Sequence, residues 1–180
     1  YNVAVGRDAL RANTTGAQNV AVGTDALDAN TTGSTNTALG DQALSANTTA
    51  SNNTAVGFNA LNVNTTGTKC VAVGAYALDA SDADDNTAVG YNAMTANTTG
   101  IRNAALGQSA LGANTTGTRN TAIGAQALDA SSTASYNTAL GYGCLTETTT
   151  GEYNTAVGLS ALLFNTTGQY NTDQLYSIIK

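Results

Sequence analysis

The chain has 180 residues without histidine, proline or tryptophan, and its formal net charge is −6 with only 10% charged residues. The lack of histidine excludes Ser-His, Cys-His and the common zinc arrangements, and six scattered basic residues predict no nucleic-acid partner. No apolar run approaches the ~18 residues of a membrane span. We therefore expect no enzyme, no cofactor and no membrane span.

A repeat of 17 residues organises the chain from Asn2 onward. The first unit reads Asn-Val-Ala-Val-Gly, two variable residues, Ala-Leu, two further residues and then Asn-Thr-Thr-Gly. Every interval between units is 17 residues except the interval after Cys70, which is 16. The chain opens in the middle of its repeat, so we expect it to be a piece of a longer protein. Later units begin at Asn19, Asn36, Asn53, Cys70, Asn86, Asn103, Asn120, Asn137 and Asn154.

The repeat predicts two short strands per unit. Asn-Thr-Ala-Val-Gly is short, β-branched and bounded by turn residues, which is typical of a strand, and a second strand is expected over residues 9–12 and their equivalents. Asn-Thr-Thr-Gly predicts a turn. Units this short cannot hold two helices, so the sequence predicts an all-β, parallel β-solenoid of about ten 17-residue coils, roughly 48 Å long.

The solenoid is expected to span residues 1–170, and residues 171–180 form a cap or docking tail. An open solenoid end exposes unpaired strand edges that attract other chains. Leu175, Tyr176, Ile178 and Ile179 are the most apolar cluster of this tail. We therefore expect the tail to cover the last coil or to contact another subunit.

Side-chain alternation along the first strand divides the inside from the outside. We expect Val3 and Val5 to point inward together with Leu10 and Ala12. The third repeat position, which is alanine in all ten units, would then point outward and form an oligomer face. The alternative is a crowded turn that needs small residues. The candidate face comprises Ala4, Ala21, Ala38, Ala55, Ala72, Ala88, Ala105, Ala122, Ala139 and Ala156.

The recurring Asn-Thr-Ala-Val-Gly, as at residues 53–57 and 86–90, resembles the Ser-Val-Ala-Ile-Gly repeat of trimeric autotransporter adhesin heads. It is also similar to the Asn-Thr-Ala-Val-Gly-x-x-Ala-Leu repeats of bacteriophage tail-fibre-like proteins. The resemblance covers residues 2–170 and implies a left-handed β-roll, often trimeric, in an adhesive extracellular fibre. Longer coils and the Asn-Thr-Thr-Gly turn depart from these families, and no binding residues transfer.

Acidic residues lie mostly at variable positions, as expected for a solvated surface, so we predict no pair of catalytic carboxylates. Asp82, Asp84 and Asp85 cluster in the one shortened coil. Three carboxylates are a weak candidate for a calcium site. The alternative is a polar loop that compensates for the deleted residue.

Seven Asn-Thr-Thr turns are N-x-Thr sequons, which accept glycans when they are exposed and the host glycosylates. They would form a row along one edge of the rod. The alternative is that asparagine and threonine only build the turn. The candidate acceptors are Asn13, Asn30, Asn47, Asn64, Asn97, Asn114 and Asn165.

Threonines of the same turns suggest ice binding as a second functional class. Thr14 and Thr15, with their equivalents, form two files at β spacing, and regular threonine arrays bind ice in many antifreeze solenoids. A flat array requires Thr-x-Thr, however, whereas adjacent threonines in a turn present one file.

Tyr136, Tyr153 and Tyr170 occupy the seventeenth position of three successive units and predict an external aromatic ladder. Such a ladder binds sugars or a neighbouring chain, or it only stabilises the C-terminal coils. Phe58, Tyr76 and Tyr91 are expected to form another outward patch.

Cys70 and Cys144 lie four coils apart, roughly 19 Å along the rod. A disulfide needs Cα atoms within roughly 7 Å. We therefore expect two unpaired, buried cysteines.

Together these patterns predict a structural and adhesive fibre segment on a cell surface or virion, which associates with other copies as a homotrimer or filament and contacts surface glycans. The alternatives are an ice-binding solenoid and a glycosylated filament without adhesive activity.

Overall fold

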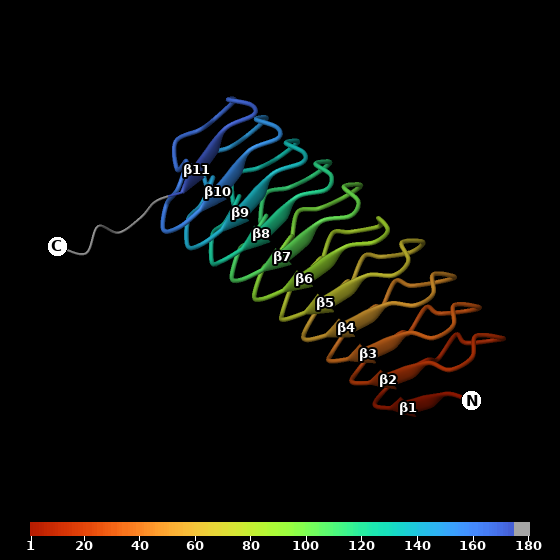
Figure 1. Ribbon diagram of the computed structural model, residues 1–180. Helices are drawn as coiled ribbons and strands as arrows, with labels where there is room; N and C mark the ends of the chain where they lie inside the picture. Colours follow the sequence, from red (N-terminus) through yellow and green to blue (C-terminus); the bar gives the residue numbers. More distant parts are fainter. Residues whose placement is uncertain (175–180) are drawn as a thin grey trace.

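The computed structural model describes residues 1–174, and these form a single stack of coils (Figure 1). Eleven parallel strands make one sheet in the order of the chain. The architecture is the all-β parallel solenoid that the sequence predicts. The strands are β1 (Val3–Val5), β2 (Val20–Val22), β3 (Thr37–Leu39), β4 (Thr54–Val56), β5 (Val71–Val73), β6 (Thr87–Val89), β7 (Ala104–Leu106), β8 (Thr121–Ile123), β9 (Thr138–Leu140), β10 (Thr155–Val157) and β11 (Thr172–Gln174).

Every strand pairs in repeat register with its neighbour, so that equivalent residues lie in straight files. Ala4 is opposite Ala21, and the register persists across the shortened coil, where Val71 is opposite Thr87. β11 continues this register beyond the predicted boundary at residue 170, because Thr172 is opposite Thr155. The prediction for Leu175, Tyr176, Ile178 and Ile179 falls outside the described residues.

The predicted second strand is wrong, because residues 9–12 and their equivalents form stacked turns. Within residues 1–174, strands occur only at the first site of each coil. Asp25 and Leu27 have φ angles of 54° and 51°, a left-handed conformation that cannot continue a strand. The turns still stack, since the Leu27 amide donates to the Ala43 carbonyl of the next coil at 3.1 Å. Each turn is also closed internally, as by the bond of 3.2 Å from the Asn30 amide to the Leu27 carbonyl.

The orientation expected for the first strand is also wrong: the central alanine points inward and its two neighbours point outward. Ala38 and Leu44 are fully buried, whereas Leu39 is 47% exposed. The coil is narrow, so leucines from the turn side fill most of its interior and leave room only for a methyl group opposite. Leu10, Leu27 and Leu44 belong to one core file, as predicted.

Two ladders of asparagine side chains fill the remaining interior. At the first repeat position, Asn19 Oδ1 accepts from the Asn36 amide at 2.9 Å, and Asn19 Nδ2 donates to the Gly33 carbonyl at 2.8 Å. At the turn, Asn47 Nδ2 donates to Asn30 Oδ1 at 2.8 Å. Buried amides are tolerated where they find partners within their own turn and in the neighbouring coils; Asn64 Oδ1 and Asn114 Oδ1 are exceptions without a partner.

Residues 1–174 contain no helix of the length and apolarity that a membrane crossing would require. The coil direction, predicted as left-handed, stays a prediction.

Candidate functional site: the outer face of the sheet

The outward side chains of the strands form a flat face of two files, which we call the sheet face. Alternation along each three-residue strand sends its first and third residues outward. The first file is mostly threonine and valine: Val3, Val20, Thr37, Thr54, Val71, Thr87, Ala104, Thr121, Thr138, Thr155 and Thr172. The second file is aliphatic up to β10: Val5, Val22, Leu39, Val56, Val73, Val89, Leu106, Ile123, Leu140, Val157 and then Gln174.

The sheet face carries no charged residue in either file. Its largest side chains are well exposed: Leu39 by 47%, Leu106 by 48% and Leu140 by 45%. Ten steps between neighbouring strands extend the face over roughly 48 Å. A continuous aliphatic file of this length, beside an uncharged file of threonine and valine, is unusual on an isolated chain and is typical of interaction surfaces.

The size of the sheet face is sufficient for a stable protein interface. Each of the ten strands β1–β10 contributes two outward side chains. These twenty residues match the roughly 20–30 residues that each partner contributes to a standard interface.

The predicted alanine face is wrong. Ala21, Ala55 and Ala88 are fully buried in the core of a single chain, and among the ten alanines only Ala4, in the first coil, is exposed. Alanine recurs there because no larger side chain fits inside the coil. The outward surface of each strand is therefore formed by the two residues that flank its central alanine.

The predicted row of glycan acceptors is wrong for the central coils. Asn30, Asn47, Asn64, Asn97 and Asn114 are fully buried. Their Nδ2 atoms, to which a glycan would be linked, donate inside the coil; that of Asn97, for example, donates to Ser81 Oγ at 3.2 Å. Asn13 and Asn165, in the first and last coils, are half-buried and donate to Gly16 and Gly168 carbonyls in the same way. These asparagines build the turn.

The turn threonines present one exposed file, as the sequence analysis anticipated for adjacent threonines. In the central coils the first threonine of the turn is tied to the stack; Thr31, for example, is half-buried and its Oγ1 donates to the Thr48 carbonyl at 3.0 Å. The second threonine, such as Thr49 or Thr116, is exposed. A two-file array of threonine and valine exists instead on the sheet face.

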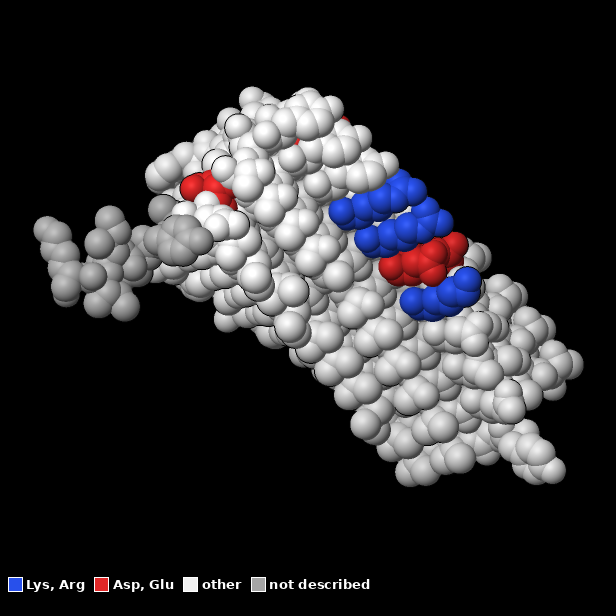
Figure 2. All heavy atoms as spheres, in the orientation of Figure 1, with Lys and Arg blue, Asp and Glu red and all other residues white. Residues whose placement is uncertain are grey.

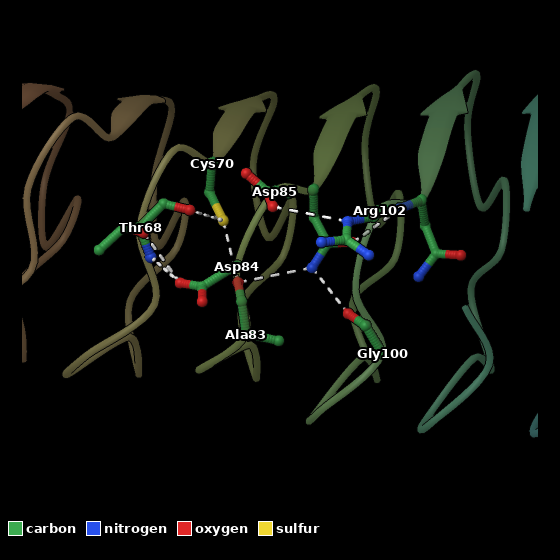
Figure 3. Close-up of polar contacts among 9 residues, drawn as sticks. Thr68, Cys70, Ala83, Asp84, Asp85, Gly100 and Arg102 are labelled. Atoms are coloured by element: carbon green, nitrogen blue, oxygen red, sulfur yellow. Dashed lines mark hydrogen bonds and ion pairs between the residues drawn. The ribbon is translucent and has the colours of Figure 1, made fainter. Parts of the chain in front are cut away.

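The acidic cluster compensates for the deleted residue of the fifth coil. Asp82 accepts from the amides of Thr65 and Thr66 at 2.8 and 2.6 Å, in place of the carbonyl used in other coils. Asp84 accepts from the Thr68 amide at 2.6 Å, and Asp85 lies 3.8 Å from the Arg102 guanidinium (Figure 3). No group of three metal-ligating side chains occurs in residues 1–174, so the cluster fits the polar-loop alternative.

The pKa of Asp82 reflects this role. Burial alone would raise the pKa of its carboxyl, but hydrogen bonds from the Thr66 amide and from the Thr65 hydroxyl and amide outweigh burial and lower the pKa below its usual value.

The predicted tyrosine ladder is confirmed as a stack. The rings of Tyr136 and Tyr153 lie 4.8 Å apart at 10°, and those of Tyr153 and Tyr170 lie 5.0 Å apart at 3°. Arg119 continues the file, with its guanidinium 5.3 Å from the Tyr136 ring centroid. Because the ring faces cover one another, the ladder supports the stabilising interpretation.

Phe58, Tyr76 and Tyr91 also pack together, with edge-to-face contacts at 5.3 and 6.2 Å between centroids. Phe58 and Tyr91 follow the glycines after β4 and β6, so they extend the apolar surface beside the sheet face.

Both cysteines are free and buried, as predicted. Burial raises the pKa of the Cys70 thiol to about 11 and also raises that of Cys144, so neither is a reactive thiolate at neutral pH.

Sequence reasoning missed the sheet face, although a signal for it exists. The second repeat position varies among valine, threonine and alanine, while the third never departs from alanine. A position that accepts both a hydroxyl and an alkyl group fits the surface, and a position restricted to one methyl group fits a confined interior.

The chain matches no protein-family model, no curated protein and no solved structure.

Proposed function

We propose that this chain is a structural segment of an extracellular fibre, in which copies associate side by side through the sheet face. The observation that carries the proposal is the uncharged aliphatic file from Val5 to Val157, in which the leucines and the isoleucine are exposed and the valines after Val5 are half-buried. The resemblance to adhesin heads and tail fibres supports a cell-surface or virion location and an adhesive role.

A second copy fits this face better than an unrelated partner does. The face repeats with the period of the coil, so any surface that matches it over its length needs the same spacing between files. Another copy of the chain has that spacing. Burial of aliphatic side chains contributes roughly 25 cal/mol per Å² of apolar surface, and the entropy lost on association is subtracted from this gain. The gain grows with the length of the contact, so a contact along the whole rod can be stable although it is narrow.

The first test is the substitution Leu106→Lys at the middle of the sheet face. We expect the unmodified chain to sediment as a multiple of its 18.0 kDa mass. A lysine buried without a partner should weaken association at least about tenfold, which is about 1.4 kcal/mol. Analytical ultracentrifugation over a concentration series measures both.

The matched control is Thr116→Lys, because Thr116 is exposed on a turn outside the sheet face. It introduces the same charge and should leave the mass unchanged. A single-chain mass for the unmodified protein at high concentration, or equal association of the two variants, would refute the proposal.

Ice binding is the second candidate, and the Thr-x-Val pattern of strands such as β4 and β10 favours it. These strands hold threonine and valine in two regular files, roughly 6.6 Å apart along the strand and 4.8 Å apart between strands. It ranks second because Leu39, Leu106 and Leu140 interrupt the uniform size of the valine file. Thermal hysteresis by the single chain, without self-association, would reverse the order of the two candidates.

A further inference from the structure

Two rows of side chains border the sheet face, one on each side. The leading edge is the residue two positions before each strand: Tyr1, Gln18, Thr35, Asn52, Lys69, Asp85, Arg102, Arg119, Tyr136, Tyr153 and Tyr170. The trailing edge is the residue two positions after each strand: Arg7, Thr24, Asp41, Phe58, Ala75, Tyr91, Gln108, Ala125, Tyr142 and Leu159.

The leading edge is charged in its middle and aromatic toward the C-terminus. Lys69, Asp85, Arg102 and Arg119 border the successive strands β5 to β8. Figure 2 shows basic side chains in adjacent bands along one edge of the white sheet face, with an acidic band between them. Arg119 is held against Tyr136, to whose hydroxyl it donates at 2.7 Å. Its place at the edge is therefore fixed by the neighbouring coil.

The trailing edge has small or neutral side chains at the same heights. Ala75 and Ala125 border β5 and β8, the strands that carry Lys69 and Arg119 on their other side. The remaining trailing residues at the charged heights are Tyr91 beside β6 and Gln108 beside β7.

Toward the C-terminus, both edges become apolar together. Tyr142 and Leu159 border β9 and β10 on the trailing side and are 55% and 67% exposed. Tyr136 and Tyr153 border the same two strands on the leading side.

We infer that the two edges are complementary and pair across the interface between copies, strand by strand, which makes the rods parallel and in register. Any symmetry axis parallel to the rods brings the leading edge of one copy against the trailing edge of the next. Lys69 and Arg119 then meet Ala75 and Ala125, so each long side chain faces a small one.

The other charged pairs are also favourable in this arrangement. Asp85 meets Tyr91, whose hydroxyl can donate to a carboxylate, and Arg102 meets Gln108, whose carbonyl can accept. No like-charged pair occurs along the ten strands that have both edges described. Tyr136 and Tyr153 meet Tyr142 and Leu159, which buries aromatic surface at one end of the contact.

Antiparallel association in full overlap lacks this complementarity. A two-fold axis along the strands places each edge against its own copy, and full overlap of the eleven strands sets β5 opposite β7 and β6 opposite itself. Lys69 then meets Arg102, and Asp85 meets a second Asp85. Like charges in direct opposition are unfavourable. A shift that sets β5 opposite β6 removes them and places Lys69 opposite Asp85, but it loses the contact of one strand.

This inference rests on the proposed self-association and is tested by paired cysteines. In the Arg119→Cys/Ala125→Cys variant, parallel in-register copies bring the two thiols together between chains. We expect oxidation, or a short bismaleimide, to link most chains into covalent species with as many chains as the native oligomer, because every leading edge meets a trailing edge. Non-reducing electrophoresis and native mass report the outcome.

Three controls accompany this experiment. The unmodified chain shows whether the buried Cys70 and Cys144 form any link between chains. Each single variant, Arg119→Cys or Ala125→Cys, should remain unlinked, since neither residue faces its own copy in the parallel arrangement. The Asn52→Cys/Arg119→Cys variant links only if fully overlapped copies are antiparallel, because β4 then lies opposite β8.

The possible failures are distinguishable. An oligomer whose Arg119→Cys/Ala125→Cys chains do not link, or whose Asn52→Cys/Arg119→Cys chains do, overturns the edge pairing and leaves the self-association standing. A single-chain mass for the unmodified protein overturns both. Both variants lie at exposed or half-exposed positions whose residue type changes between coils, and a melting curve confirms that each is folded.

Discussion

At the scale of single residues, the turn asparagine ladder is continuous only while successive coils supply asparagine. Asn114 Oδ1 is buried without a hydrogen-bond partner, and so is Ser131 Oγ in the next coil. Serine is too short to reach the amide oxygen below it. The ladder therefore has a local defect where the repeat departs from its own pattern.

The substitution Ser131→Asn should repair this defect. The new amide would donate to Asn114 Oδ1 and to the Ala134 carbonyl, as Asn47 does to Asn30 Oδ1 at 2.8 Å and to the Ala50 carbonyl at 3.1 Å. We expect the free energy of unfolding to rise by about 1 kcal/mol, measured by thermal or urea unfolding. Thr133→Asn, at an exposed position of the same turn, should change nothing; equal effects of the two variants would contradict the ladder.

Partly buried carboxylates on the turn side give a pH-dependent prediction. Burial raises the pKa of the Asp129 carboxyl, so its charged form opposes folding. This unfavourable contribution is complete above the folded pKa and disappears below the unfolded pKa near 3.9. At the same repeat position, Asn62 Nδ2 donates to the Gln42 carbonyl at 3.0 Å.

Asp129→Asn should therefore stabilise the chain at pH 7, by about 1 kcal/mol through a similar hydrogen bond to the Ser109 carbonyl. The gain should shrink as the pH falls to 3, where the native carboxyl is protonated. Unfolding curves at both pH values provide the test, with Asp41→Asn as a control at an exposed carboxylate. Destabilisation at pH 7 would show that the charge of Asp129 has a favourable partner.

At the scale of the strand and its flanking turns, glycine permits the close approach of successive coils. Gly57 follows β4 with a φ angle of 133°, and a Cβ atom there would lie 2.7 Å from the Gly74 carbonyl carbon and oxygen. Both the backbone conformation and the contact exclude other residues. The glycine at the fifth repeat position is thus fixed by the stack itself.

Gly57→Ala should destabilise the chain by about 3 kcal/mol or more, since backbone rather than a flexible side chain obstructs the new methyl group. Gly112→Ala is the matched control. Its Cβ would meet Asp129 Oδ1, the free end of a side chain, and the same repeat position holds Ser45 and Asn62 in other coils. Comparable melting temperatures for the two variants would refute the close stacking.

Some features of the coil can be predicted from the sequence and others cannot, depending on the interaction that determines each feature. The 17-residue period, the file of Leu27 and Leu44 and the stack of Tyr136 on Tyr153 all follow from equivalence between units, which the sequence displays directly. The second strand did not form because residues such as Leu27 adopt positive φ, and no composition rule predicts this for leucine.

The orientation of the strand was predicted wrongly because the prediction considered the hydrophobicity of each side chain but not its volume. Val3 is more apolar than alanine, yet the narrow interior admits only alanine opposite leucine, as at Ala38 and Leu44. The sequons were misjudged for a related reason: a polar turn residue such as Asn47 looks exposed until the neighbouring coils supply its partners.

At the scale of the whole molecule, fold and proposed function are connected by the outward orientation of the aliphatic side chains of the strands. A strand that directs alanine inward must direct Thr, Val, Leu or Ile outward at every level. The stack multiplies two outward side chains into a continuous apolar surface along the rod, and this surface supports the proposed assembly with other copies.

The orientation of the strand is tested most directly by two substitutions to leucine at adjacent positions of β6. Ala88 is fully buried, whereas Val89 occupies the outward position that already holds Leu39, Leu106 and Leu140. We predict that Val89→Leu leaves the thermal unfolding midpoint unchanged, while Ala88→Leu overpacks the coil and destabilises it by about 3 kcal/mol or more. The reverse result, with Ala88→Leu tolerated and Val89→Leu unfolded, would contradict the inward alanine, the sheet face and the assembly built on it.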